Sequence, residues 1–419
     1  MILIRLAVLS LRNRWFTVLL TVFAVALSVA LFLGVEKVRN GARASFADTI
    51  SGTDLIVGAR TGGIQLLLYS VFRIGNATNN ISWQSYQQLA RRDEVGWIVP
   101  LSLGESHRGF RVMGTSPDYF RHYKFRGGRS LSFASGRPFS DLFDAILGAD
   151  AAAGLGYKMG DPLVVSHGLG EISHADHRDK PFRVAGILAK TGTPVDRTVL
   201  VSLEAIEAIH LDWKDGARVP GMKISADAVR RMTLTPKAVT AAMIGLKSKL
   251  QTFRLQRFVN EYEDEALLAI LPGVALQELW DIVATAEQAL IVVSAMVVLA
   301  ALLGLTTMML STLNERRREM AVLRSVGAGP RTIVGLLMTE AGLLSLCGVL
   351  LGVTLLYAGL FLARPLADEM FGLYLPISFL SQRELLILLA VVGSGTGVCL
   401  LPAWRAYRMS LADGMTVRS

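Results

Sequence analysis

Four long apolar runs constrain the fold more than any other feature of this sequence. A bilayer core about 30 Å thick requires about 20 apolar residues of helix, so each run is long enough to cross a membrane. The chain is also 52% hydrophobic and only 18% charged, which is unusual for a soluble protein. We therefore predict four membrane helices, whose apolar cores cover residues 15–34, 289–310, 333–363 and 385–401.

The positions of the arginines predict the orientation of these helices. Short cytoplasmic segments are enriched in Lys and Arg. The N-terminal segment, the link between the second and third helices, and the C-terminal tail together have a net charge of +8, close to the +9 of the whole chain. Both termini are therefore expected in the cytoplasm, with the chain in the inner (cytoplasmic) membrane. This topology explains the positive charge, and no basic stripe with interleaved aromatic residues favours a nucleic-acid partner.

The chain between the first and second helices is long enough to form a large folded domain outside the cytoplasm. Strand-like runs bounded by Gly, Pro or Asp alternate there with helix-like stretches, which favours an α+β domain. The strand-like runs are residues 55–57, 96–99, 110–113, 163–165 and 182–188, and the helix-like stretches are residues 82–92 and 202–209.

Near its end this domain is expected to become helical. Residues 247–271 are rich in Leu, Gln, Glu and Arg. Pro272-Gly273 then interrupts the pattern, and residues 274–287 lead without another Pro or Gly into the second membrane helix. We expect that helix to project from the membrane as a stalk.

The link between the second and third helices predicts a short amphipathic helix at the membrane surface. Met320, Leu323 and Gly327 recur every three to four residues, while the arginines occupy other positions around the helix. Gly327 and the Gly329-Pro330 pair mark its end. Two explanations stay open: the helix contacts another protein, or it lies on membrane lipid, because any short cytoplasmic loop collects arginine.

The order of residues in this link resembles the cytoplasmic loop of the FtsX/MacB/LolC-type ABC permeases. In that family an R-R-x-E-x-A-x-L-R-x-x-G-A run precedes a helix that contains an E-A pair. The matching residues here are Arg317, Arg318, Glu319, Ala321, Leu323, Arg324, Gly327, Ala328, Glu340 and Ala341. Further segments resemble the family along essentially the whole chain, namely residues 6–21, 145–165, 182–188 and 402–406.

The resemblance implies four transmembrane α-helices, with a large α+β extracytoplasmic domain of the MacB type between helices 1 and 2. The implied segments are an N-terminal amphipathic segment with helix 1 (1–35), the extracytoplasmic domain with its stalk (36–285), helix 2 (286–311), a cytoplasmic coupling helix (312–331), helix 3 (332–363), a short extracytoplasmic loop (364–384), helix 4 (385–404) and a cytoplasmic tail (405–419).

The resemblance also implies a function and partners. Members of this family are permeases of ABC transporters, in which the loop helix docks on an ATPase dimer and the outer domain couples to substrate. Carried over, the docking residues are Arg317, Arg318, Glu319, Met320, Leu323, Arg324 and Gly327. The sequence has no G-x-x-x-x-G-K-[ST] phosphate-binding loop, so ATP and Mg²⁺ are expected on a separate ATPase and this chain is not expected to be an enzyme. The other expected partners are a second permease copy or a homologue, and a periplasmic adaptor or substrate-binding protein.

Small and acidic residues within the predicted spans suggest packing roles. Gly348 and Gly352 on the third helix, and Gly393 and Gly397 on the fourth, allow close helix contacts, either between subunits or within one subunit. Glu340 is the only acid in the third span. A proton relay would need partner acids or histidines in the spans, so we expect Glu340 to pair with a polar or basic group instead.

A histidine-rich segment lies in the outer domain. His167, His174 and His177 fall within residues 166–179 together with three carboxylates. Histidine and carboxylate ligands at such spacing could bind zinc. A Gly- and Ser-rich loop also collects polar residues simply because it is solvated, so both explanations stay open. Apart from this zinc, no cofactor is expected to bind the chain directly.

Three functions are compatible with the sequence. The first is export or extraction of a hydrophobic cargo, such as a lipoprotein, lipid, peptide or drug, driven by ATP hydrolysis in a partner. The second is FtsX-like regulatory mechanotransmission without transport, and the third is metal-ion handling by the histidine segment. The size of the outer domain favours the first function.

Overall fold

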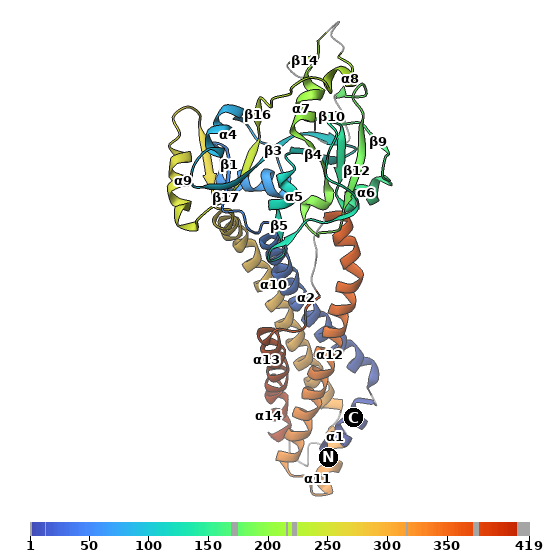
Figure 1. Ribbon diagram of the computed structural model, residues 1–419. Coiled ribbons are helices and arrows are strands. Elements are labelled where there is room, and N and C mark those ends of the chain that lie inside the picture. Colours follow the sequence, from blue (N-terminus) through green and yellow to red (C-terminus); the bar gives the residue numbers. More distant parts are fainter. Residues whose placement is uncertain are drawn as a thin grey trace. The chain divides into compact units, whose positions relative to one another are not determined.

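The computed structural model describes residues 2–12, 14–168, 175–214, 217–219, 224–315, 317–371 and 377–408. The chain divides into two compact units, which are a helical part and a part rich in strands (Figure 1). The first unit comprises residues 1–41, 284–366 and 375–419, and the second comprises residues 42–283 and 367–374. Each unit has its own apolar clusters of buried side chains.

Four long apolar helices confirm the predicted membrane spans. They are α2 (Trp15–Asp48), α10 (Pro272–Glu315), α12 (Pro330–Phe371) and α13 (Gln382–Val398), and the short helix α1 (Ile2–Arg12) precedes them. Three of the four are longer than a bilayer requires, since the 44 residues of α10 extend about 66 Å at 1.5 Å per residue. The segment predicted as a stalk, residues 274–287, is part of α10.

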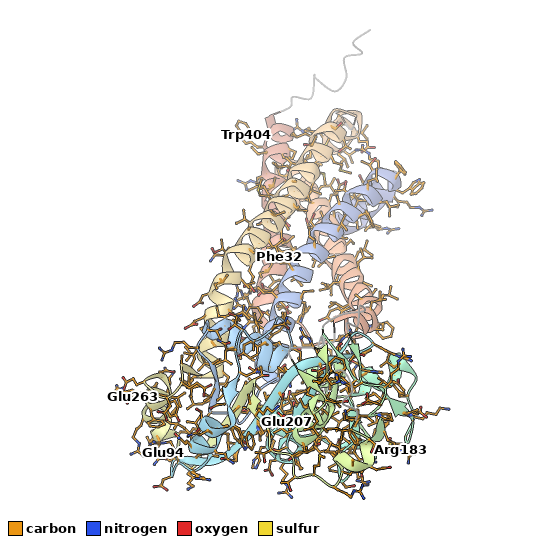
Figure 2. The ribbon with its side chains drawn as sticks, turned by 90° about the horizontal axis from the view of Figure 1, so that it is seen from above. Phe32, Glu94, Arg183, Glu207, Glu263 and Trp404 are labelled. Carbon is orange, nitrogen blue, oxygen red and sulfur yellow. The ribbon has the colours of Figure 1, made fainter. Side chains whose placement is uncertain are left out.

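The fourth span continues to Trp404, but as two helices. After α13 ends at Val398, α14 (Leu400–Arg408) follows. Pro402 explains the interruption, because proline has no N–H for the carbonyl of Val398 and its ring crowds that carbonyl. Trp404 of α14 is exposed (Figure 2), as a residue at a membrane–water interface would be.

Helices α2, α12 and α13 share an apolar core, and the helices of the first unit also carry exposed large apolar side chains. The core is formed by Val25, Val29 and Leu33 of α2, Val349 and Leu356 of α12, and Leu388 and Val391 of α13. The exposed side chains include Leu19, Leu20, Leu27, Val292, Met296, Leu350 and Leu386. Exposed apolar surface on this scale fits contact with lipid.

A buried charged network joins α2 to the start of α13. The Lys37 ammonium lies 3.2 Å from Glu384 Oε2 and donates hydrogen bonds to the carbonyl oxygens of Ser378 and Phe379 at 3.1 and 3.0 Å. Ser381 caps α13, with its hydroxyl accepting from the Glu384 N–H while the Glu384 carboxylate accepts from the Ser381 N–H. The Lys37 and Glu384 side chains are only 8% and 3% exposed. The same carboxylate therefore caps α13 and fastens it to α2.

The second unit is built on a mixed, mostly antiparallel sheet. Among the described residues, nine strands follow the order β18-β1-β17-β3-β4-β13-β8-β12-β7, and β9, β10 and β11 attach to β12 and β3. Two pairs are parallel, β13 with β4 and β12 with β8. The strands are β1 (Leu55–Ala59), β3 (Val95–His107), β4 (Phe110–Thr115), β7 (Phe133–Gly136), β8 (Asp144–Leu147), β9 (Pro162–Leu163), β10 (Ser166–His167), β11 (Ala175–Asp176), β12 (Phe182–Leu188), β13 (Thr198–Ser202), β17 (Ala241–Leu246) and β18 (Leu267–Ile270).

Short helices and three small strand pairs complete this unit. The hydroxyls of Ser82 and Ser202 cap α4 and α7 by accepting from the N–H groups of Ser85 and Ala205. The helices are α3 (Gly63–Leu67), α4 (Trp83–Ala90), α5 (Asp118–His122), α6 (Ala149–Leu155), α7 (Leu203–His210), α8 (Ala226–Val229) and α9 (Thr252–Asn260). The small pairs are β2 (Ile81–Ser82) with β16 (Ala238–Val239), β5 (Lys124–Phe125) with β6 (Arg129–Ser130), and β14 (Trp213–Lys214) with β15 (Ala217–Arg218).

The sequence-based expectation of helix across residues 247–271 is only partly correct. Helix α9 covers residues 252–260, but Leu267–Ile270 forms the strand β18, which pairs with β1 at the edge of the sheet. The Asn260 side-chain carbonyl accepts a hydrogen bond from the Ala269 N–H at 2.7 Å. Pairing with β1 therefore overrides the local helical preference of these residues.

Candidate functional sites

The cytoplasmic link forms the short helix that the sequence predicts. Helix α11 (Arg317–Ser325) lies between α10 and α12. The chain then turns at Gly327, whose φ of +99° is in the left-handed region that favours glycine. Gly327 thus ends the helix by conformation and offers no side chain to a partner.

Met320 holds α11 against the membrane helices. It is buried in a cluster with Leu313 of α10, Ile333 and Leu337 of α12, and Ala403 of α14. A side chain packed within its own chain is not available to a partner. Met320 therefore fixes the position of α11 and does not belong to its exposed face.

The exposed face of α11 carries residues that the sequence analysis did not single out. Val322 is 58% exposed, and Val326, just beyond the end of the helix, is 83% exposed. Glu319 is exposed as well. The three lie at i, i+3 and i+7, so they form one stripe of the helix surface. We call Glu319, Val322 and Val326 the docking face. The sequence does contain a signal for this face. Val322 and Val326 are a second apolar pair, four residues apart, and they lie on a different side of the helix from Met320.

The remaining residues predicted for docking are less exposed or lie outside the described part of the chain. Leu323 and Arg324 are half-buried, and Arg324 takes part in an interaction within the chain. The side chains of Arg317 and Arg318 are outside the described residues. Their role in docking stays a prediction.

The glycine pair on α12 lets that helix approach α2 of the same chain. A Cβ added to Gly348 would lie 2.6 Å from Val25 Cγ1, and one added to Gly352 would lie 2.6 Å from the Ala26 carbonyl oxygen. Only glycine permits contacts this close. On the same helix, Glu340 is buried and interacts within the chain, which is compatible with the predicted structural pairing.

Substitution of the two glycine pairs separates packing within the chain from packing between subunits. Gly352→Leu is expected to lower the free energy of unfolding by about 1–3 kcal/mol or more, because it overpacks the α2–α12 contact. Gly393→Leu is expected to change the free energy of unfolding by no more than about 0.5 kcal/mol, because no described atom lies within 4 Å of a Cβ added at Gly393 or at Gly397. Thermal melts of the full chain in detergent measure both effects. Equal effects would contradict this assignment, and a changed oligomeric state of Gly393→Leu alone would place Gly393 and Gly397 between subunits.

A cavity of about 300 Å³ lies in the second unit. Its lining combines the aromatic rings of Phe46, Phe72 and Phe110 with the guanidinium groups of three arginines, Arg73, Arg111 and Arg197. Arg111 donates to Asn76 Oδ1 and to the Gly75 carbonyl oxygen, both at 3.0 Å, and Arg197 lies 5.5 Å from the centre of the Phe110 ring. Burial, followed by the nearby charge of Arg73, lowers the pKa of Arg111. The cavity therefore suits an amphipathic molecule that carries a negative charge.

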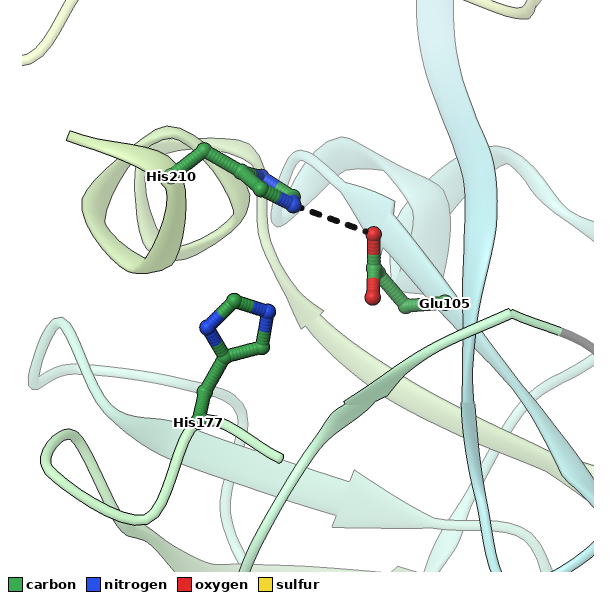
Figure 3. Close-up of side chains that lie close together, drawn as sticks. All are labelled: Glu105, His177 and His210. Atoms are coloured by element: carbon green, nitrogen blue, oxygen red, sulfur yellow. Dashed lines mark ion pairs between the residues drawn. The ribbon is translucent and has the colours of Figure 1, made fainter. Parts of the chain in front are cut away.

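The histidines of the predicted zinc loop are not found together in the described residues. The side chain of His167 and the whole of His174 lie outside them. His177 is fully buried and meets two residues from distant parts of the sequence, Glu105 and His210 (Figure 3). One potential ligand atom from each of these three residues lies within 4.8 Å of the other two.

The local structure directs each of the three side chains into the same place. Glu105 follows a bulge in β3, where the pairing with β4 shifts between Leu103 and Glu105 and Gly104 has a φ of +155°. His177 follows β11 directly, and its N–H donates to the Val165 carbonyl at 3.0 Å. His210 is the last residue of α7.

The contacts of the two imidazoles follow from their surroundings. His210 Nδ1 is 2.8 Å from the Ile206 carbonyl oxygen, which can only accept, so Nδ1 carries a hydrogen. His210 Nε2 lies 3.2 Å from Glu105 Oε1. The His177 ring packs on Trp213 with ring centres 4.7 Å apart, and burial lowers the pKa of His177 to about 4. His177 is therefore neutral at neutral pH.

The fold and the link together define a multi-pass membrane permease with a large extracytoplasmic domain. Two family models match the chain: a MacB-like periplasmic core domain matches residues 18–242, and an FtsX-like permease C-terminal domain matches residues 291–411. The chain belongs to the MacB/FtsX-type ABC transporter permeases.

Two curated relatives match the chain at low identity. The macrolide export ATP-binding/permease protein MacB of Nitrobacter winogradskyi is 24% identical over 413 residues, which cover 94% of this chain and 57% of the relative. The pyoverdine export ATP-binding/permease protein PvdT of Pseudomonas syringae pv. tomato is 25% identical over 289 residues, which cover 66% of this chain and 40% of the relative. The chain thus spans about half the length of these relatives.

Solved structures of outer domains also match. The periplasmic region of MacB from Actinobacillus actinomycetemcomitans aligns with 55% of this chain and 94% of its own length, at 10% identity and a TM-score of 0.34. The extracellular domain of the noncanonic ABC-type transporter YknZ from Gram-positive bacteria aligns with 52% of this chain and 98% of its own length, at 13% identity and a TM-score of 0.29.

Proposed function

We propose that this chain is the permease subunit of an ABC transporter that passes the ATP-driven motion of a partner ATPase to the outer domain, for export or extraction of a hydrophobic cargo. The docking face of α11, formed by Glu319, Val322 and Val326, carries this proposal. Exposed valines beside a carboxylate, on a helix held rigidly by Met320, suit a protein partner better than a loop that only rests on lipid headgroups.

The connections of α11 suit the transmission of motion. Helix α11 is anchored to α10, α12 and α14 through the Met320 cluster, so a displacement of α11 moves packed helices rather than a free loop. Helix α10 runs without a break from Glu315 back to Pro272, which belongs to the second unit. In this proposal, both termini and α11 are cytoplasmic and the second unit is outside.

Hydrolysis of ATP belongs to a partner in this proposal. The 419 residues contain no G-x-x-x-x-G-K-[ST] loop to hold nucleotide phosphates. ATP and Mg²⁺ would therefore be bound by an ATPase dimer, with a second copy of this permease or a homologue completing the membrane part. A periplasmic adaptor or a substrate-binding protein could join the assembly at the second unit.

The cavity of the second unit supports transport over regulation without transport. Regulation requires no ligand site, whereas a lining of Phe46, Phe72 and Phe110 beside Arg73 and Arg111 offers both apolar and cationic contacts to a cargo. Lipids, lipoproteins, acidic peptides and amphipathic drugs share the chemistry that this lining would bind. Two relatives are named for macrolide and pyoverdine export, which supports transport as the function.

Val326→Glu tests the docking face. A carboxylate in place of an exposed apolar side chain of the docking face is expected to lower the amount of ATPase that co-purifies with the chain, and the ATPase activity of the complex, by about tenfold or more. Val274→Glu is the matched control, because Val274 is 53% exposed and lies in α10 within the second unit, away from α11 in the sequence. The control should keep both properties. Unchanged co-purification and activity in Val326→Glu would contradict the proposal.

A further inference from the structure

We propose that Glu105, His177 and His210 form a binding site for a divalent transition-metal ion, for which Zn²⁺ is the best fit. The bound ion would fasten together β3, the segment after β11 and the end of α7. This inference does not depend on the docking face or on any ATPase, because all three ligands lie in the second unit.

The donor atoms match what zinc prefers. Two imidazole nitrogens and one carboxylate oxygen are a known zinc ligand set, with a fourth position left for water. Imidazole also suits copper, iron and nickel, whereas Mg²⁺ and Ca²⁺ prefer oxygen ligands throughout. Ligand atoms around a tetrahedral zinc lie ~3.3 Å apart, given bonds of ~2.0–2.2 Å. His210 Nε2 and Glu105 Oε1 are already 3.2 Å apart. The ligand atom of His177 lies within 4.8 Å of both, so a small side-chain rotation of His177 brings its nitrogen to bonding distance of the same ion.

His210 is oriented as a metal ligand would be. Its Nδ1–H donates to the carbonyl of Ile206 at 2.8 Å, within the same helix. A histidine that binds a metal through one nitrogen usually donates a hydrogen bond from the other, which fixes the ring and the position of its lone pair. His210 Nε2 therefore faces the carboxylate of Glu105, and Figure 3 marks this pair with a dashed line.

His177 supplies the independent observation that points to a ligand. Its ring is fully buried, and neither ring nitrogen has a hydrogen-bond partner among the described residues. Such a group destabilises a folded protein unless something satisfies it. His107 on β3 shows that this domain can satisfy a buried histidine: its Nδ1–H donates to the Val164 carbonyl at 2.7 Å, and its Nε2 accepts from the Tyr157 hydroxyl at 3.0 Å. The different state of His177 is explained if a metal ion takes one of its nitrogens.

A metal at this point would stabilise the second unit. The three ligands come from segments that are far apart in the sequence, and the unfolded chain does not bring them together. An ion that binds only the folded form raises its stability in proportion to the logarithm of the ion concentration.

The first experiment uses the full chain in detergent, stripped with a chelator and then given Zn²⁺ alone. We expect one zinc per chain by elemental analysis after desalting. At a zinc concentration about 100 times Kd, the melting temperature should rise by roughly 5–10 °C. Failure to bind zinc at micromolar concentration would overturn the proposal.

Substitutions then test the ligand set. Glu105→Gln and His210→Ala should each weaken zinc binding by at least about tenfold, since even the loss of a group that only orients a ligand has an effect of this size. His122→Ala is the matched control, because the His122 ring stacks on Trp97 and does not belong to the cluster. It should bind zinc like the unsubstituted chain. Zinc binding that survives substitution of each of the three ligands would identify an adventitious ion only.

A double variant separates this site from the loop predicted from the sequence. His167→Ala/His174→Ala should leave zinc binding unchanged. If that variant loses zinc while His210→Ala keeps it, the ion belongs to the loop and the present proposal is wrong.

Because truncating a buried ring can lower the melting temperature by itself, a Co²⁺ titration supplies a second measurement. The visible absorption bands of bound Co²⁺ report the ligands directly and should change in Glu105→Gln.

Discussion

Lys180→Met is expected to lower the free energy of unfolding of the second unit by about 3–5 kcal/mol. Lys180 and Asp212 are both fully buried, and the Lys180 ammonium donates to Asp212 Oδ1 and lies 3.2 Å from Asp179 Oδ2. Removing the cation breaks this buried ion pair, and the loss of one partner of a buried pair destabilises the fold by more than the attraction within the pair contributes. Urea and thermal unfolding of the full chain in detergent, followed by tryptophan fluorescence, measure the loss.

The control for this prediction replaces both charges. In Lys180→Met/Asp212→Leu the two fully buried charges are removed together, and exchange of a whole ion pair for apolar groups of similar volume is often neutral or stabilising. The double variant should therefore recover most of the stability that the single variant loses. A double variant less stable than Lys180→Met would show that the pair stabilises the fold in some other way.

The second large effect is expected in the helical unit. Lys37→Met should also lower the free energy of unfolding by about 3–5 kcal/mol, because it leaves the Glu384 carboxylate, which is 3% exposed, without its cation. It also removes the ammonium that donates to the carbonyl oxygens of Ser378 and Phe379, which precede α13, although the Ser378 carbonyl keeps its hydrogen bond from the Tyr357 hydroxyl. The start of α13 should then separate from α2, and limited proteolysis near Ser378 should become faster, alongside a lower melting temperature.

The matched control for Lys37→Met is a lysine that donates to an exposed hydroxyl and not to a buried carboxylate. The Lys124 ammonium donates to the Ser130 hydroxyl at 2.6 Å on the surface of the second unit. Lys124→Met is therefore expected to change stability by no more than about 0.5 kcal/mol. If Lys37→Met and Lys124→Met gave similar melting curves, the network around Lys37 would contribute no more than an ordinary surface contact.

The membrane helices and much of the sheet were predictable because their signals are local. An apolar run of about 20 residues is sufficient to predict a span, whatever the rest of the chain does. Residues 182–188 form β12 as predicted, since a mostly apolar run that follows Pro181 is visible directly in the sequence. The strand β18 was not predictable in this way. Leu267–Ile270 is a strand because β1 offers an edge to it, and β1 lies some 200 residues earlier.

The functional surfaces show the same limit. The motif identified α11, but only the packed structure distinguishes Met320, which is buried, from Val326, which is exposed. Sequence spacing joined His177 to His167 and His174 because they are neighbours along the chain. The structure joins His177 to Glu105 and His210 instead, through a bulge in β3 and the end of α7. No periodicity in the sequence encodes contacts between such distant segments.

The unbroken course of α10 has a thermodynamic consequence. The residues of this helix, from Pro272 to Glu315, belong to both units, as do those of α2 and α12, so a displacement at one end of such a helix can reach its other end. Linkage between two binding sites is reciprocal. If nucleotide binding below the membrane changes how strongly the outer domain holds its ligand, then that ligand must change the affinity of the ATPase for nucleotide by the same factor.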